Sequence, residues 1–218
     1  MNQAAQKSGK KPLIIVSSIV ILLLAIIGIM FALALSNPNA SITPVEQTKT
    51  GVEKLVKAAV TGEPAHLSAE EMNAILVQTK VKNVRFTINS NNTADAYAPV
   101  EYKGIKFGVS ANLTITTASE KQISATVNSM KIGRLPVDPA LLMQYCKEVL
   151  PKEISVDKNV LRIDSSLLDT YILGDMVGMN INSLSIADQS FVVNVTGNLD
   201  KLKDYITKNL QSYIGLLS

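Results

Sequence analysis

The chain has 218 residues, 47% of them hydrophobic, and its 21 basic and 18 acidic side chains give a net charge of +3 at pH 7. Lys7, Lys10 and Lys11 account for this excess, so the rest of the chain lacks the basic surplus expected of a nucleic-acid-binding protein. Cys146 is the only cysteine, which excludes an intramolecular disulfide.

Residues 1–12 form a basic, cytoplasmic N-terminus, and Leu13 to Leu35 is an unbroken run of 23 apolar or small residues. A helix needs roughly 20 apolar residues to cross a hydrocarbon core about 30 Å thick, so we predict a transmembrane helix over residues 13–35. The lysines on its N-terminal side place all later residues outside a plasma membrane that is crossed once. A signal peptide cleaved after Ala34 is the alternative, although its apolar core would exceed the usual length of about 7–15 residues.

The polar segment 36–44 contains two prolines and is expected to be a spacer, followed by an extracytoplasmic domain over residues 45–218. Apolar residues at helical spacing predict a first helix over residues 45–60, ended by Gly62. Ser68 followed by Glu71 forms a capping box, which predicts a second helix over residues 69–79.

From residue 80 to residue 132 the hydrophobic pattern changes to a two-residue period, which predicts strands in series. Turn residues at 89–92, 103–104 and 119–121 separate these strands, so we expect an antiparallel meander with one apolar face. Because that face needs a cover, the two preceding helices are expected to pack on it.

The second half of the domain mixes helices and strands again. We predict a helix over residues 139–150, a strand over 155–163, a helical turn within 167–173, a hairpin around Asp188-Gln189 and an amphipathic helix over 200–217. The expected fold class is therefore α+β: an N-terminal transmembrane helix followed by a curved, mainly antiparallel sheet packed on amphipathic helices.

The sequence has no recognisable catalytic or metal-binding constellation. His66 is the only histidine and no Gly-x-Ser-x-Gly elbow is present. One histidine and one cysteine supply too few ligands for a typical zinc site. Glu70 and Glu71 are explained by the start of a helix, where negative side chains interact favourably with the helix dipole. We expect no catalytic residue, no metal and no cofactor, and we predict that the protein is not an enzyme.

The segment from residue 132 to residue 139 joins the strand series to the central helix, and its glycine and two prolines fix a rigid corner. A functional interpretation is compatible with this structural one. In that interpretation, the segment forms the lip of an apolar groove between sheet and helix, or contacts a partner, through Ile132, Gly133, Leu135, Pro136 and Val137.

The basic N-terminus, the single crossing, the strand series and the run Lys131-Ile132-Gly133-Arg134-Leu135-Pro136-Val137 together resemble the YpmS-like family of uncharacterised membrane-anchored proteins of Gram-positive bacteria. The resemblance covers most of residues 10–200. It implies a bacterial plasma membrane and an external domain, and it supplies no activity and no site residue.

We therefore expect a non-enzymatic, membrane-anchored binding module that holds a lipid or lipid-linked envelope component in an apolar groove. The alternative is a structural or assembly partner of a cell-envelope protein complex. Ala25, Gly28 and Ala32 place small residues on one face of the predicted span, where a second helix could pack. A hydrolase acting on wall or lipid fits less well, because the sequence does not group the catalytic side chains it would need.

Overall fold

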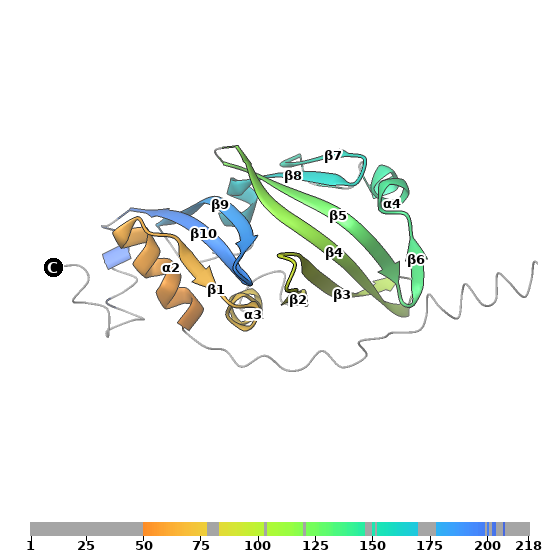
Figure 1. Ribbon diagram of the computed structural model, residues 1–218, viewed down its shortest axis with the longest axis horizontal. Helices are drawn as coiled ribbons and strands as arrows, with labels where there is room; N and C mark the ends of the chain where they lie inside the picture. Colours follow the sequence, from red (N-terminus) through yellow and green to blue (C-terminus); the bar gives the residue numbers. More distant parts are fainter. Residues whose placement is uncertain are drawn as a thin grey trace, which may run out of the picture.

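A computed structural model describes residues 50–77, 83–102, 104–119, 121–146, 152–169 and 178–198, together with residues 150, 200, 202, 203 and 207 (Figure 1). The predicted span over residues 13–35, the spacer, and Ala25, Gly28 and Ala32 lie outside these residues. Most of the predicted C-terminal helix also lies outside them. In the described part, no helix is both long enough and apolar enough to span a membrane.

The described chain is an α+β domain, and every strand pair in it is antiparallel (Figure 1). In chain order the elements are α2 (Thr50–Thr61), β1 (Ala65–Leu67), α3 (Ala69–Val77), β2 (Arg85–Ile88), β3 (Ala94–Tyr102), β4 (Ile105–Ser119), β5 (Gln122–Ile132), β6 (Leu135–Val137), α4 (Pro139–Cys146), β7 (Ile154–Asp157), β8 (Val160–Asp164), α5 (Ser165–Leu168), β9 (Met179–Ala187) and β10 (Ser190–Gly197).

Local sequence signals explain the ends of the first two helices. The N–H of Gly62 donates to the carbonyl of Ala58 at 2.8 Å, and Gly62 has a φ of +76°, so it ends α2 with a left-handed cap. The capping box of α3 is confirmed: the Ser68 N–H donates to Glu71 Oε2 at 2.8 Å, and the Glu71 N–H donates to Ser68 Oγ at 3.2 Å.

The predicted hairpin around Asp188-Gln189 is confirmed as β9 and β10. Asp188 and Gln189 have φ angles of 50° and 54°. Two consecutive left-handed residues in a two-residue loop match the right-handed twist of the flanking strands, which explains why this loop returns the chain directly on itself.

The strands form two sheets. The smaller sheet has the order β1-β10-β9, and the larger sheet has the order β2-β3-β4-β5-β8-β7, with β6 also paired to β5. The predicted meander is confirmed, because β2, β3, β4 and β5 are neighbours in chain order. Strands β4 and β5 are the long central strands of the larger sheet in Figure 1.

Two different strands share the outer edge of β5. Strand β8 pairs with residues 122–126 and β6 pairs with residues 130–132. A β-bulge separates these stretches, because Leu113 pairs with Val127 whereas Asn112 pairs with Ser129. In the gap, the Val127 N–H donates to the carbonyl of Asn159 at 2.8 Å, and Asn159 Nδ2 donates to the carbonyl of Val127 at 3.1 Å. The β7–β8 turn thus replaces the missing strand partner of Val127.

The main hydrophobic core lies where the smaller sheet meets the helices and one end of the larger sheet. The largest side chains that are almost fully buried come from α2, α3, β1, β5, β9 and β10, and from Leu202 beyond β10. They are Leu55, Val56, Leu67, Ile75, Ile123, Val127, Ile181, Phe191, Val193 and Leu202. The rings of Phe86 on β2 and Phe191 on β10 meet edge to face at 5.6 Å, which joins the two sheets.

The structure differs from the sequence expectations in three places. Helix α2 contacts mainly β10 and β1 of the smaller sheet, so the helices do not cover the whole inner face of the strand series. The stretch predicted as one strand over residues 155–163 is the β7–β8 hairpin, whose turn contains Lys158 with a φ of 54°. The sequence pattern puts Leu141, Leu142, Tyr145 and Val149 on one side of the helix over residues 139–150, yet in α4 Leu141 is 54% exposed and Met143 is buried.

Candidate functional site

The end of the larger sheet that lies away from α2 carries rows of apolar residues on one face. Strand registers define two such rows, because residues paired across an antiparallel sheet point to the same side. One row comprises Ala98, Val109, Ile132 and Leu135, and the next comprises Phe86, Ala96, Ala111, Met130 and Val137. Each row crosses at least four strands, so the apolar surface is continuous across the sheet.

All the residues in these two rows are only partly buried. We call the following set the apolar face: Ala96, Ala98, Phe107, Val109, Ala111, Met130, Ile132, Leu135 and Val137. The next row toward the core contains Ala94 and Val127, which are 0% and 1% exposed. The apolar face is therefore the continuation of the core surface beyond the elements that cover the core.

The exposure of β4 changes steadily along this face. Ile115 is 7% exposed and belongs to the core cluster, whereas Ile105 at the start of the strand is 40% exposed. The side chains at alternate positions between them are partly buried. Since strands rise about 3.4 Å per residue, the partly covered stretch from Ile105 to Leu113 is roughly 27 Å long.

The structure divides the predicted groove residues between two sides of the sheet. Ile132 and Leu135 are directly paired, and Val137 pairs with Met130, so these three side chains share the apolar face. Pro136 pairs with Lys131 and lies on the opposite side, where it is exposed. Gly133 is buried in the β5–β6 turn with a φ of 58°, and its N–H donates to the carbonyl of Gly108 at 2.7 Å. This bond holds the turn against β4.

Sequence reasoning identified this corner and missed most of the face. Ala96, Ala98 and Ala111 are small residues that give a weak strand signal, so the sequence reading did not single out β3. The two-residue alternation that includes Phe107, Val109 and Met130 was visible in the sequence, but it could not show that α2 and α3 contact mainly β1, β2 and β10. Coverage depends on where α2 and α3 pack, which is a tertiary property.

Side chains close several strand edges that could otherwise accept another strand. The Phe86 N–H donates to Asn73 Oδ1 and Asn73 Nδ2 donates to the Phe86 carbonyl, both at 2.8 Å, so Asn73 occupies the edge of β2. The Ile181 N–H on β9 donates to Asp169 Oδ1 at 2.5 Å. Burial raises the pKa of Asp169 above its usual 3.8. These contacts occupy backbone groups at the edges of β2 and β9 that an added strand would need.

The opposite side of the larger sheet carries a polar network. Asn112 Nδ2 donates to Asp95 Oδ1 at 2.6 Å and to Thr93 Oγ1 at 3.1 Å, and Asn128 Nδ2 donates to Asn112 Oδ1 at 2.8 Å. Asn128 is the extra residue of the β5 bulge, and it also donates to Thr114 Oγ1 at 3.0 Å. The side of this sheet that carries the network is therefore richer in hydrogen-bonding side chains than the apolar face, although Tyr97 on the same side is buried.

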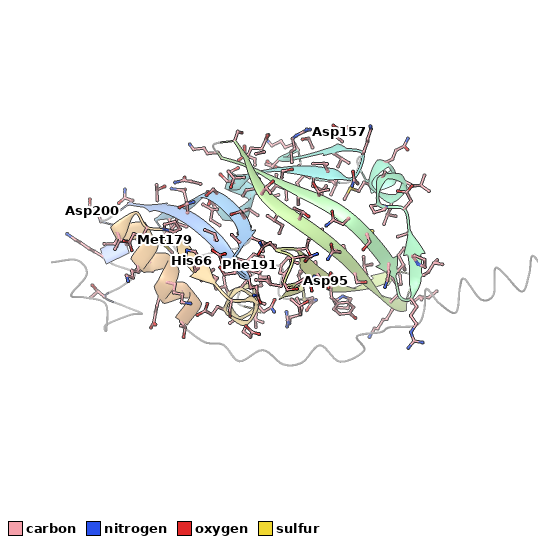
Figure 2. The ribbon with its side chains drawn as sticks, in the orientation of Figure 1. His66, Asp95, Asp157, Met179, Phe191 and Asp200 are labelled. Carbon is pink, nitrogen blue, oxygen red and sulfur yellow. The ribbon has the colours of Figure 1, made fainter. Side chains whose placement is uncertain are left out.

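His66 lies on β1 (Figure 2), beside a cavity of about 210 Å³ that is lined by α2 and the α2–β1 connection. Its Nδ1 atom is 3.3 Å from Ser190 Oγ, a pairing across 124 residues that the sequence did not indicate. Ser190 Oγ also donates to the Ala187 carbonyl at 2.9 Å, and the direction of its contact with His66 depends on the histidine tautomer.

The cavity beside His66 is electrostatically balanced. Lys54 Nζ donates to the His66 carbonyl at 3.0 Å and forms an ion pair with Glu71 at 2.8 Å. Glu63 and Lys57 also line the cavity. Within the described residues, no group of three or more histidine, cysteine, aspartate or glutamate side chains could hold a metal ion. The apolar face is consequently the stronger candidate for a binding surface.

Comparisons with protein-family models, with curated proteins and with solved structures found no match for this chain.

Proposed function

We propose that this chain is a membrane-anchored, extracytoplasmic, non-enzymatic binding module that holds a lipid acyl chain against the apolar face. The observation that carries the proposal is the continuous set of partly buried apolar side chains across β3, β4, β5 and β6. Apolar contacts of this kind suit a chain of methylene groups, because removing apolar surface from water contributes roughly 25 cal/mol per Å² without requiring a directional partner.

The position of the predicted anchor supports a lipid as the occupant. The apolar run ends at Leu35 and α2 begins at Thr50, so 14 residues join them. Even fully extended, this segment reaches about 50 Å at most. The anchor would therefore confine the domain to the neighbourhood of a bilayer, where the local concentration of acyl chains is high.

Photo-crosslinking of the full chain in membranes tests this proposal. The probe is a phosphatidylcholine with a diazirine in its acyl chain, and the labelled residues are identified by peptide mass spectrometry. We expect labelling on β4, β5 and β6 in addition to the predicted span. Labelling confined to residues 13–35 would contradict the proposal.

Two variants at neighbouring positions make the test specific. Val109→Asn places an amide on the apolar face and should abolish labelling of the sheet, because the bound chain would have to desolvate a polar group. Ser110→Asn is the matched control, since Ser110 pairs with Lys131 on the opposite side. It should leave the labelling pattern unchanged.

A further inference from the structure

We infer that a phospholipid bound to the apolar face lies along β4 in one direction, with its head at the Ile105 end and its tail pointing toward Ile115. This inference rests on the proposed function and adds the class of ligand and its orientation. It follows from three properties of the face: one end is closed by the core, the other end is open to solvent, and the length accommodates one acyl chain together with its glycerol and phosphate groups.

The closed end is the core. Phe86 on β2 meets Phe191 on β10, and Ala94 and Val127 on the next row are almost fully buried. Strand β4 also contacts β9 at this end. A polar headgroup placed here would lose its hydration without gaining a partner, which is costly. A terminal methyl group forms no hydrogen bonds with water and so has none to lose. The end of the acyl chain therefore belongs at this end of the face.

The open end is formed by the β3–β4 connection and the β5–β6 turn. Ile105 is 40% exposed there. The Gly133 N–H bond to the Gly108 carbonyl brings the β5–β6 turn to this part of β4. Arg134, in that turn, is exposed. A guanidinium group is a strong donor to phosphate oxygens, so the phosphate belongs at this end.

The length of the face fits this arrangement. The partly covered stretch from Ile105 to Leu113 spans roughly 27 Å, whereas the acyl region of one leaflet is about half of the 30 Å hydrocarbon core. One lipid tail is therefore shorter than the face. The remaining length at the open end accommodates the glycerol and phosphate groups.

Tryptophan fluorescence can test the orientation, because the natural chain contains no tryptophan. The full chain is reconstituted in phosphatidylcholine vesicles as Ile105→Trp at the open end or Met130→Trp on the inner row. Each variant is quenched with phosphatidylcholine carrying a nitroxide either near the carbonyl or near the methyl end of its acyl chain. Leu141→Trp on α4 is the control, since Leu141 is exposed and lies outside the apolar face.

We expect the carbonyl-end nitroxide to quench Ile105→Trp more strongly, and the methyl-end nitroxide to quench Met130→Trp more strongly. The reverse order would overturn the orientation while preserving lipid binding. Equal quenching of both positions by the carbonyl-end label alone would show that the face lies flat on the bilayer, which also overturns the orientation. Quenching no greater than that of Leu141→Trp at both positions would overturn the proposed function itself. Circular dichroism checks folding, and Val137→Trp, on the same row, replaces Met130→Trp if that variant does not fold.

Discussion

Asn73 and Phe86 exchange two hydrogen bonds of 2.8 Å, so a side chain of α3 provides β2 with the donor and acceptor of a neighbouring strand. Asn73 is 9% exposed, and its amide has the same donor and acceptor pattern as a peptide group. This pairing fixes α3 against the end of the larger sheet and leaves the backbone of Phe86 without an open site for another chain.

Replacing Asn73 with alanine should destabilise the protein by about 2–4 kcal/mol, because it leaves two shielded backbone groups of Phe86 without partners. Urea denaturation measures the change in the free energy of unfolding. Asn128→Ala is the comparison, since Asn128 is exposed and its bonds can be replaced by water. We expect that variant to cost less than about 1 kcal/mol. Similar losses in the two variants would contradict the structural role assigned to Asn73.

Gly197→Ala should destabilise the protein by about 1–3 kcal/mol through overpacking. A Cβ atom at Gly197 would overlap the side chain of Leu202 and lie 3.1 Å from Ala59 Cβ. Leu202 is fully buried, so it has little room to move. A double-mutant cycle with Leu202→Ala checks the cause, because removing the larger side chain relieves the overlap. The double variant should then lose less stability than the sum of the two single losses.

Asp169 and Asp164 should give opposite pH dependences of stability. Burial raises the pKa of folded Asp169 above its usual 3.8, so its folded form binds the proton more tightly than the unfolded chain, and stability falls as pH rises through this window. Hydrogen bonds from Ser166, first from its hydroxyl and then from its N–H, lower the pKa of Asp164 below 3.8. Its contribution is present above that value and is lost as pH falls through the lowered pKa.

Urea titrations at a series of pH values separate the two aspartates. Asp169→Asn keeps an oxygen for the Ile181 N–H and should remove the fall in stability above pH 3.8. Asp164→Asn weakens the N-cap of α5 and should reduce stability at neutral pH more than at low pH. The prediction fails if both variants change the pH profile in the same direction.

Alanine substitutions should distinguish the apolar face from the core. Val127 is 1% exposed, so Val127→Ala should cost about 2 kcal/mol in the free energy of unfolding. Val109 is partly exposed, and Val109→Ala should cost less than about 1 kcal/mol. If Val109→Ala is as destabilising as Val127→Ala, the face contributes to folding in the manner of a core and its aliphatic character needs no ligand to explain it.

Elements specified by neighbouring residues were predictable from the sequence. The capping box of Ser68 and Glu71 and the tight loop at Asp188-Gln189 depend on interactions within a few residues. The meander followed from the two-residue period between residues 80 and 132, and with it the mainly antiparallel α+β architecture.

The remaining features depend on residues far apart in the chain. Strand β1 has only three residues and exists because residues 65–67 pair with residues 191–193 of β10. The buried side of α4 is set by its packing near β5 and β7. For the candidate site, the sequence identified Ile132, Leu135 and Val137, whereas the extent of the apolar face depends on where α2 and α3 pack. Periodicity shows which side chains point to the same side of a strand, but it does not show which other elements pack on that side.

The division of the β5 edge between β8 and β6 has a consequence for how this protein can vary. Residues 122–126 of β5 pair with β8, and residues 130–132 pair with β6. The bulge at Asn128 lies between these two stretches. A change in the length or sequence of β6 therefore leaves the pairing of β8 intact. Substitutions in β6 should thus change one end of the apolar face while the strands that enclose the core keep their pairing.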